Sequence, residues 1–191
     1  MLDPIDQLLV EHREIMAEVE TLRRTVNDLH ARGEAALPGA IPALASAGRM
    51  MATRLLRHAR KEDEALFPAI EHALGLPAAA TPGAGGGPTA LMRDEHRVIH
   101  ERSQVFRETL RELNEVEHPA IVAGGARLRA LARGGTDAAT LADTGEAVIS
   151  LLDLHFGKEE DILFPMAREV LSRDDLRTVA ECMAAIEMEA V

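Results

Sequence analysis

Residues 55–68 read LLRHARKEDEALFP and residues 152–165 read LDLHFGKEEDILFP, so one short pattern occurs twice in the chain. Histidine, lysine, glutamate, leucine, phenylalanine and proline stand at identical offsets in the two copies. A histidine and a glutamate four residues apart share one face of an α-helix. Each copy is therefore expected to present one His-Glu pair on the same side of a helix.

A second, shorter pattern, Glu-His-Arg, begins at residue 11 and again at residue 95, upstream of each long copy. The two patterns together indicate an internal duplication. The stretch 75–87 is rich in Gly and Pro, which is typical of a linker. The expected domains are a duplicated bundle over 1–171, with halves 1–74 and 88–171 joined by the linker 75–87, and an additional C-terminal helix over 172–191.

The composition favours helices over strands. Aromatic residues make up only 2% of the chain, with four Phe and neither Trp nor Tyr, whereas β-sandwiches and barrels depend on aromatic and β-branched residues. Apolar residues recur at steps of three and four, which is typical of bundle helices. The expected fold class is all-α, an up-down four-helix bundle from an internal duplication, followed by a short C-terminal helix.

The apolar pattern and the helix breakers give approximate helix bounds. The pattern predicts bundle helices over about 3–31, 41–73, 88–117 and 141–171. The third helix is expected to end at His118-Pro119, and a short helix between loops is expected within 119–140. The expected inward stripe of the last bundle helix contains Val148, Leu152, His155, Glu159, Ile162 and Met166.

Charge and cysteine content exclude several classes of protein. The formal net charge of −11 argues against a general binder of nucleic acid or of acidic membranes, since both need a positive surface. The single cysteine, Cys182, excludes an intrachain disulfide framework. No apolar run approaches the ~20 residues of a membrane span, and the N-terminus lacks the basic region of a signal peptide. The expected location is the cytoplasm.

On each expected bundle helix, a histidine or a glutamate stands where the apolar pattern requires leucine or isoleucine. A buried carboxylate costs several kcal/mol (~3 or more) unless it is paired or bound to a metal. A single core histidine is usually a hydrogen-bonded core residue, and an acidic run is usually a solvated face, but residues at matching heights on four helices favour a metal site. Histidine and carboxylate suit iron, manganese or zinc. The candidate ligands are His12, His58, Glu62, His96, His100, His155 and Glu159, whereas His30, His72 and His118 are assigned no role, His118 because of its expected place at a helix end.

The order His, His-x-x-x-Glu, His-x-x-x-His, His-x-x-x-Glu, with Leu-Phe-Pro at the end of both long copies, resembles the hemerythrin family over about residues 3–170. The resemblance implies a four-helix bundle that holds two non-haem iron ions bridged by two carboxylates and an oxo or hydroxo group. By the same resemblance, one iron takes His12 and His58, the other takes His96, His100 and His155, Glu62 and Glu159 bridge them, and the first iron keeps an open position.

The chain departs from the oxygen carriers of that family at one ligand. They place an aspartate five residues after the last histidine, where this chain has Glu160. The duplication favours Glu159, at the same four-residue spacing as Glu62, as the second bridge. His100 has Met16 as its counterpart in the first half, so the two halves are not equivalent.

Three classes of function follow from the resemblance. The first is a di-iron protein that binds or senses O2 or a related small ligand such as nitric oxide or peroxide, acting through a protein partner if it is a sensor. The second is an iron-handling protein or di-iron enzyme for peroxide breakdown, nitric oxide reduction or iron-sulfur cluster repair. The third is a bundle in which the metal is only structural. The Glu-x-x-His order of ferritin-like oxidases and the His-Glu-x-x-His motif of zinc hydrolases are absent from these motifs.

Overall fold

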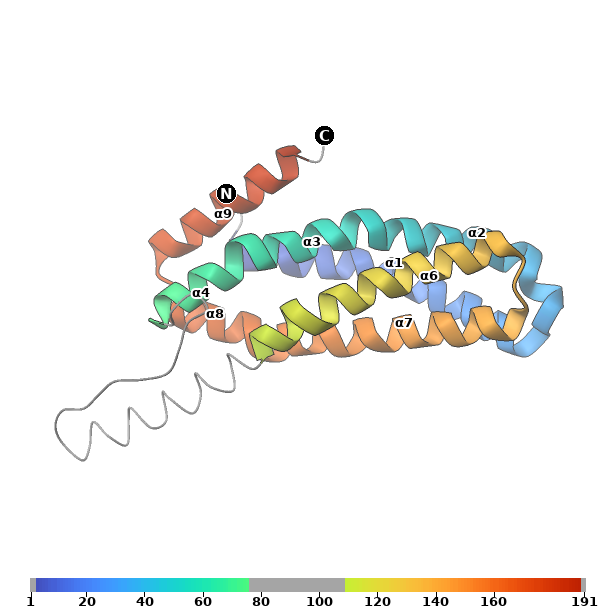
Figure 1. Cartoon of the computed structure of the whole chain (residues 1–191). Coiled ribbons are helices and arrows are strands. Elements are labelled where there is room, and N and C mark those ends of the chain that lie inside the picture. Colours follow the sequence, from blue (N-terminus) through green and yellow to red (C-terminus); the bar gives the residue numbers. More distant parts are fainter. Residues whose placement is uncertain (1–2, 76–108, 190–191) are drawn as a thin grey trace, which may run out of the picture.

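The computed structural model describes residues 3–75 and 109–189, which are almost wholly helical. Four long helical segments run side by side, up and down along one axis, and a further helix lies across one end of this bundle (Figure 1). The linker expected at 75–87 and most of the helix expected at 88–117 lie outside the described residues.

The first bundle helix, α1, spans Pro4–Arg32. Its start follows from the sequence, because the Asp3 side chain accepts hydrogen bonds from two backbone N–H groups of the first turn and Pro4 supplies a preset φ angle. The helix ends at Gly33, which has a φ of 56°. A 3-10 turn, Gly33–Ala36, then reverses the chain.

The second bundle helix is a continuous run from residue 37 to residue 73 in which α-helical and π-helical turns alternate. The α-helical parts are α2, Leu37–Met50, then α3, Leu56–Lys61, and α4, Phe67–Ala73. The π-helical turns between them are Met51–Leu55 and Glu62–Leu66.

The third bundle helix includes the π-helical turn Leu113–Glu117 and α6, His118–Gly134. The expectation that a helix ends at His118-Pro119, with only a short connecting helix beyond, was therefore wrong. Proline is tolerated here because it lies in the first turn of α6, where its missing N–H costs little. His118 consequently lies inside a long bundle helix and not at its end.

The fourth bundle helix comprises α7, Ala138–Lys158, the π-helical turn Glu159–Leu163, and α8, Phe164–Val170. After it, α9 spans Arg173–Glu189 and packs against α1 and α3. Four apolar side chains of α9 are buried in this contact: Val179, Ala180, Met183 and Ile186.

Three of the π-helical turns precede a proline. The N–H groups of Phe67, His118 and Phe164 each bond to the carbonyl five residues earlier, and a proline follows each of them directly. A proline ring clashes with the carbonyl four residues before it, and the wider π turn relieves that clash. The helices therefore continue through the prolines. Such π turns are frequent at functional sites, and here each one begins or ends at a residue of the candidate site.

The π turn also shifts the register of the apolar stripe. Ile162, expected to point inward, is 38% exposed, whereas the next residue, Leu163, is fully buried. An α-helical period continued from His155 places Ile162 inside, but the additional residue in the π turn moves Leu163 into that position. The inward assignment of Ile162 was therefore wrong, for a local backbone reason.

The core consists of two apolar clusters placed end to end along the bundle. Along α1, Leu8 belongs to one cluster and Ile15 to the other, and His12 lies between them. The polar candidate residues thus lie at the boundary between the two apolar clusters. Within the described residues, none of the helices is both long and apolar enough to cross a membrane.

Candidate metal centre

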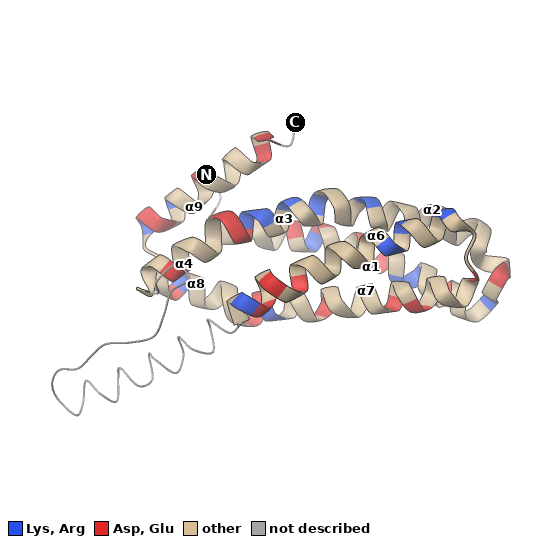
Figure 2. Cartoon of the chain, viewed as in Figure 1, with Lys and Arg blue, Asp and Glu red and all other residues tan. Residues whose placement is uncertain are grey.

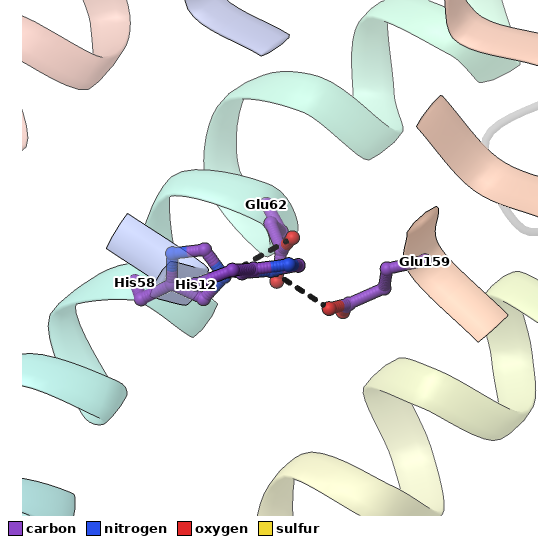
Figure 3. Close-up of side chains that lie close together, drawn as sticks. All are labelled: His12, His58, Glu62 and Glu159. Atoms are coloured by element: carbon purple, nitrogen blue, oxygen red, sulfur yellow. Dashed lines mark hydrogen bonds and ion pairs between the residues drawn. The ribbon is translucent and has the colours of Figure 1, made fainter. Parts of the chain in front are cut away.

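His12, His58, Glu62 and Glu159 meet at one point inside the bundle, from three different helices. Figure 3 shows the two imidazole rings beside the carboxylate groups of both glutamates. The Nε2 atoms of His12 and His58 are 2.9 Å apart, and Nε2 of His12 lies 3.2 Å from Oε2 of Glu159. All four side chains are at most 1% exposed.

A second group of four lies directly beside the first and consists of Glu62, His118, His155 and Glu159. Nε2 of His155 is 3.1 Å from Oε1 of Glu159, and Nε2 of His118 is 3.5 Å from Oε2 of Glu62. In each group, one donor atom from every residue lies within 4.8 Å of the others. The two glutamates belong to both groups, so the arrangement suits two cations bridged by two carboxylates.

The atoms that face this centre have unused hydrogen-bonding capacity. Both carboxylate oxygens of Glu62 and of Glu159 are buried without a hydrogen-bond partner, and so are the Nε2 atoms of His118 and His155. Orphaned buried acceptors are costly, and native proteins rarely keep them without a role. Cations placed between these atoms would satisfy all of them, so the residues present fit a two-metal centre.

The outer nitrogen of each histidine is held by a carboxylate. Nδ1 of His58 lies 3.0 Å from Oε2 of Glu11, and Nδ1 of His155 lies 2.9 Å from Oε2 of Glu117. Metal-binding histidines usually donate their other N–H to such a group, which fixes the tautomer and the ring orientation. With Nδ1 as the donor, Nε2 is left as the atom that faces the centre.

The two remaining histidines follow the same rule with carboxylates that come directly after the shared glutamates. Nδ1 of His12 is 2.7 Å from Oε1 of Glu160, and Nδ1 of His118 is 3.1 Å from Oδ1 of Asp63. Glu160 is 46% exposed, so the structure places it outside the centre. Asp63 belongs to the acidic run Glu62-Asp63-Glu64, for which a solvated face is the usual expectation; for Asp63 that expectation is wrong, because its carboxylate holds His118.

Aromatic side chains pack against histidines of both groups. The ring of Phe156 stacks on His12, with centroids 4.0 Å apart, and Phe164 lies 5.2 Å from the same ring. His118 has one stacked aromatic neighbour, Phe67, at 6.3 Å. These rings exclude water from the centre, which strengthens the electrostatic interactions among the buried groups.

Burial and charge act in opposite directions on the pKa values here. Burial lowers the pKa of His58, but the Glu62 carboxylate and the bond to Glu11 outweigh it and raise that pKa to about 10. Burial also lowers the pKa of His118, but the hydrogen bond to Asp63 and the nearby carboxylates of Glu159 and Glu62 raise it to about 12. For Glu62, burial favours the neutral acid, yet His58 and His118 hold its pKa well below the usual range. Without metal, protons on the two histidines thus balance the buried carboxylates.

Five sequence-predicted residues come together in the structure, namely His12, His58, Glu62, His155 and Glu159. His96 and His100 lie outside the described residues, so their assignment as ligands stays a prediction. His118, which sequence reasoning set aside, lies in the centre. The available signal was the pair Glu117-His118, which repeats Glu11-His12.

A family model supports the same interpretation independently of the geometry. The model of the hemerythrin HHE cation-binding domain matches residues 3–117 and again residues 114–189. No curated protein and no solved structure matches the chain. The two matches together span nearly the whole sequence, and the chain belongs to the hemerythrin HHE cation-binding domain family.

Proposed function

We propose that the chain holds two iron ions at the paired His-Glu centre and binds O2 or a related small ligand, nitric oxide or peroxide, there. The observation that carries this proposal is the set of orphaned, buried Nε2 and carboxylate atoms that converge between the four helices. Four neutral imidazoles and two carboxylates suit non-haem iron, for which two histidines and a carboxylate with open positions are typical.

The second part of the proposal concerns the open positions. Among the described residues, each group supplies four donor atoms, two of them from shared carboxylates, so we expect bound iron to keep a coordination position for a small exogenous molecule. The residues around the centre favour reversible binding over oxidation, because histidines outnumber carboxylates in it. Phe156 and Phe164 also limit the entry of water.

The alternative is an iron-handling protein or a di-iron enzyme that acts on peroxide, on nitric oxide or on damaged iron-sulfur clusters. The open positions and the buried carboxylates suit this chemistry as well. A sensor would need a partner protein to transmit its signal. A purely structural metal is the third possibility, and it predicts a centre closed to small ligands.

The decisive experiment is anaerobic reconstitution of the purified chain with ferrous iron, followed by exposure to O2, nitric oxide or azide. We expect two irons per chain and a new absorption band with each ligand. The chain has neither Trp nor Tyr, so its own near-ultraviolet absorption is weak and does not mask such a band. The variant Glu64→Ala, which changes an exposed carboxylate beside the centre, is the matched control and should behave as the wild type.

Three outcomes would separate the hypotheses. Two irons with a spectral change that reverses when the ligand is removed support the binding protein. Two irons with catalytic consumption of peroxide or nitric oxide support the enzyme. One metal per chain, zinc in protein made with ample iron, or two irons that no ligand perturbs would overturn the proposal and favour a structural metal.

A further inference from the structure

The two copies of the repeated stretch place a lysine at the same point, three residues after the histidine and directly before the shared glutamate. The two lysines have very different surroundings. Lys61 is 1% exposed, whereas Lys158 is 29% exposed. A fully buried lysine is rare unless it is paired with carboxylates, so Lys61 marks a place where the fold maintains a buried charge.

Lys61 is linked to the metal centre through one carboxylate. Its Nζ atom lies 2.6 Å from Oε1 of Glu11, and the other oxygen of Glu11 accepts from Nδ1 of His58. The other ring nitrogen of His58, Nε2, points into the centre. A change in the charge around Lys61 therefore affects His58 through Glu11, which contacts both side chains.

The second partner of Lys61 comes from α9. Its Nζ atom bonds to Oε1 of Glu187, in the last turn of that helix. The matching lysine, Lys158, contacts Glu117, the counterpart of Glu11, and also Glu112 at 3.0 Å. Glu112 lies in the same segment of chain as Glu117, so only Lys61 depends on α9 for its second carboxylate.

The acidic end of α9 is unfavourable for the helix alone. Acidic side chains near a C-terminus oppose the helix dipole, and the last turn of α9 contains no basic residue. Instead, Glu187 pairs with Arg57 at 3.1 Å and Glu189 pairs with Arg60 at 2.9 Å, both on α3. Figure 2 shows this acidic end of α9 and the basic residues along α3.

Packing alone already fixes α9 on the bundle. Its buried residues Val179, Met183 and Ile186 form an apolar contact that needs no help from surface ion pairs. Exposed ion pairs contribute little to stability. The contact between Glu187 and buried Lys61 is different, because it balances a charge close to the centre.

We propose that Glu187 of α9 is a positioning residue for the metal position formed by His12 and His58, and that it acts through Lys61 and Glu11. With Glu187 in place, the carboxylates of Glu187 and Glu11 balance the two cations Lys61 and Arg57, and Glu11 remains free to hold His58. Without Glu187, an excess positive charge lies behind His58 and opposes the binding of a cation. This inference rests on the proposed two-metal function.

The coupling has a necessary converse. If docked α9 strengthens metal binding at the His12/His58 position, then metal at that position must stabilise the docking of α9 by the same free energy. Among the described residues, the His118/His155 position has no such link to α9, so we expect the two positions to differ in affinity although the described part of each has two histidines and the same two glutamates.

The test measures the affinity for ferrous iron by anaerobic calorimetric titration. It compares Glu187→Gln with Glu112→Gln, the equivalent change beside Lys158. We expect two binding events in the wild type and a loss of about three- to tenfold in affinity for one of them in Glu187→Gln, at or below the range for groups that orient metal ligands. Glu112→Gln should stay within about twofold, because water screens the exposed Lys158. Equal effects of the two variants, or no effect of either, would overturn the inference.

Two further measurements separate positioning from structure. Glu189→Gln removes one exposed ion pair between α9 and α3, to Arg60, and should leave the affinity for iron within about twofold of the wild type. Glu187→Gln removes the ion pairs to Arg57 and to buried Lys61, so its metal-free melting temperature should lie below that of Glu189→Gln. Hydrogen exchange in the last two turns of α9 should slow when ferrous iron is added to the wild type and should not slow in Glu187→Gln. If the wild type binds no iron, the proposed function fails; if it binds two irons and exchange in α9 is unchanged, only the link to α9 fails.

Discussion

Nε2 of His118 lies 3.5 Å from Oε2 of Glu62, while the other oxygen of Glu62 lies 3.5 Å from Nε2 of His58. One carboxylate thus joins a histidine from the second bundle helix to a histidine from the third. Glu159 joins His12 and His155 in the same way, at 3.2 Å and 3.1 Å. The centre therefore has an approximate twofold arrangement in which His118 is the counterpart of His12.

The first prediction concerns His118. Replacing it with Ala should remove metal to the same degree as His12→Ala, because each supplies one of two imidazoles at a position. Elemental analysis of protein reconstituted with iron would measure this, with His72→Ala as a control on a histidine outside both groups. If His96→Ala or His100→Ala empties the centre while His118→Ala retains both ions, those histidines are the ligands and His118 is not.

The second prediction concerns the shared carboxylates. Glu62→Ala should lose metal and also destabilise the metal-free fold by about 3 kcal/mol, because it leaves His58 and His118 buried without their common partner. Chemical denaturation of the metal-free protein would measure this change. Glu64→Ala, two residues away and 48% exposed, should stay within about 0.5 kcal/mol of the wild type.

The same experiment on the second copy tests the other bridge. Glu159→Ala should lose metal, whereas Glu160→Ala should weaken binding only by releasing the ring of His12. If Glu160→Ala binds no metal after reconstitution while Glu159→Ala binds both ions, the bridge is Glu160 and not Glu159.

Sequence reasoning located the part of the centre that depends on local geometry alone. The pairs His58 with Glu62 and His155 with Glu159 follow from the helical period, which places residues four apart on one face. The helical class follows from composition and the apolar pattern. The division into halves around the linker at 75–87 stays a prediction, since that segment lies largely outside the described residues.

Sequence reasoning failed where the backbone departs from the regular α-helix. Proline usually ends a helix, which predicts a boundary at His118-Pro119, but the π turn before it lets the helix continue. The dipeptide Glu-His occurs at residues 11, 71, 95 and 117, so it could not single out His118. The contact between Lys61 and Glu187 depends on how α9 docks, which no local pattern specifies.

The third prediction tests the register of the last π turn. Leu163→Ala should destabilise the fold by about 2–5 kcal/mol, the usual cost of a cavity at a fully buried leucine. Ile162→Ala should cost less than about 1 kcal/mol, because that side chain is 38% exposed. Thermal or chemical unfolding of the metal-free proteins would measure both changes, and the reverse order would show that an uninterrupted α-helix continues through residues 159–163.

The last prediction concerns pH. In the metal-free protein the pKa of His58 is raised to about 10 and that of His118 to about 12, so both rings carry a second proton and a positive charge at neutral pH. A metal ion binds the neutral imidazole, so binding must release these protons, and the affinity must increase as the pH rises. Each proton released contributes about a tenfold increase in affinity per pH unit between about pH 6 and pH 8.

Titration of ferrous iron by calorimetry in two buffers of different ionisation enthalpy counts the protons directly. We expect release at both positions, because His58 belongs to one group and His118 to the other. The variant Asp63→Asn should reduce release at the His118 position, since the Asp63 carboxylate is one of the groups that raise the pKa of His118. An affinity independent of both pH and buffer would mean that the four rings are already neutral, and that the buried carboxylates are balanced in some other way before metal binds.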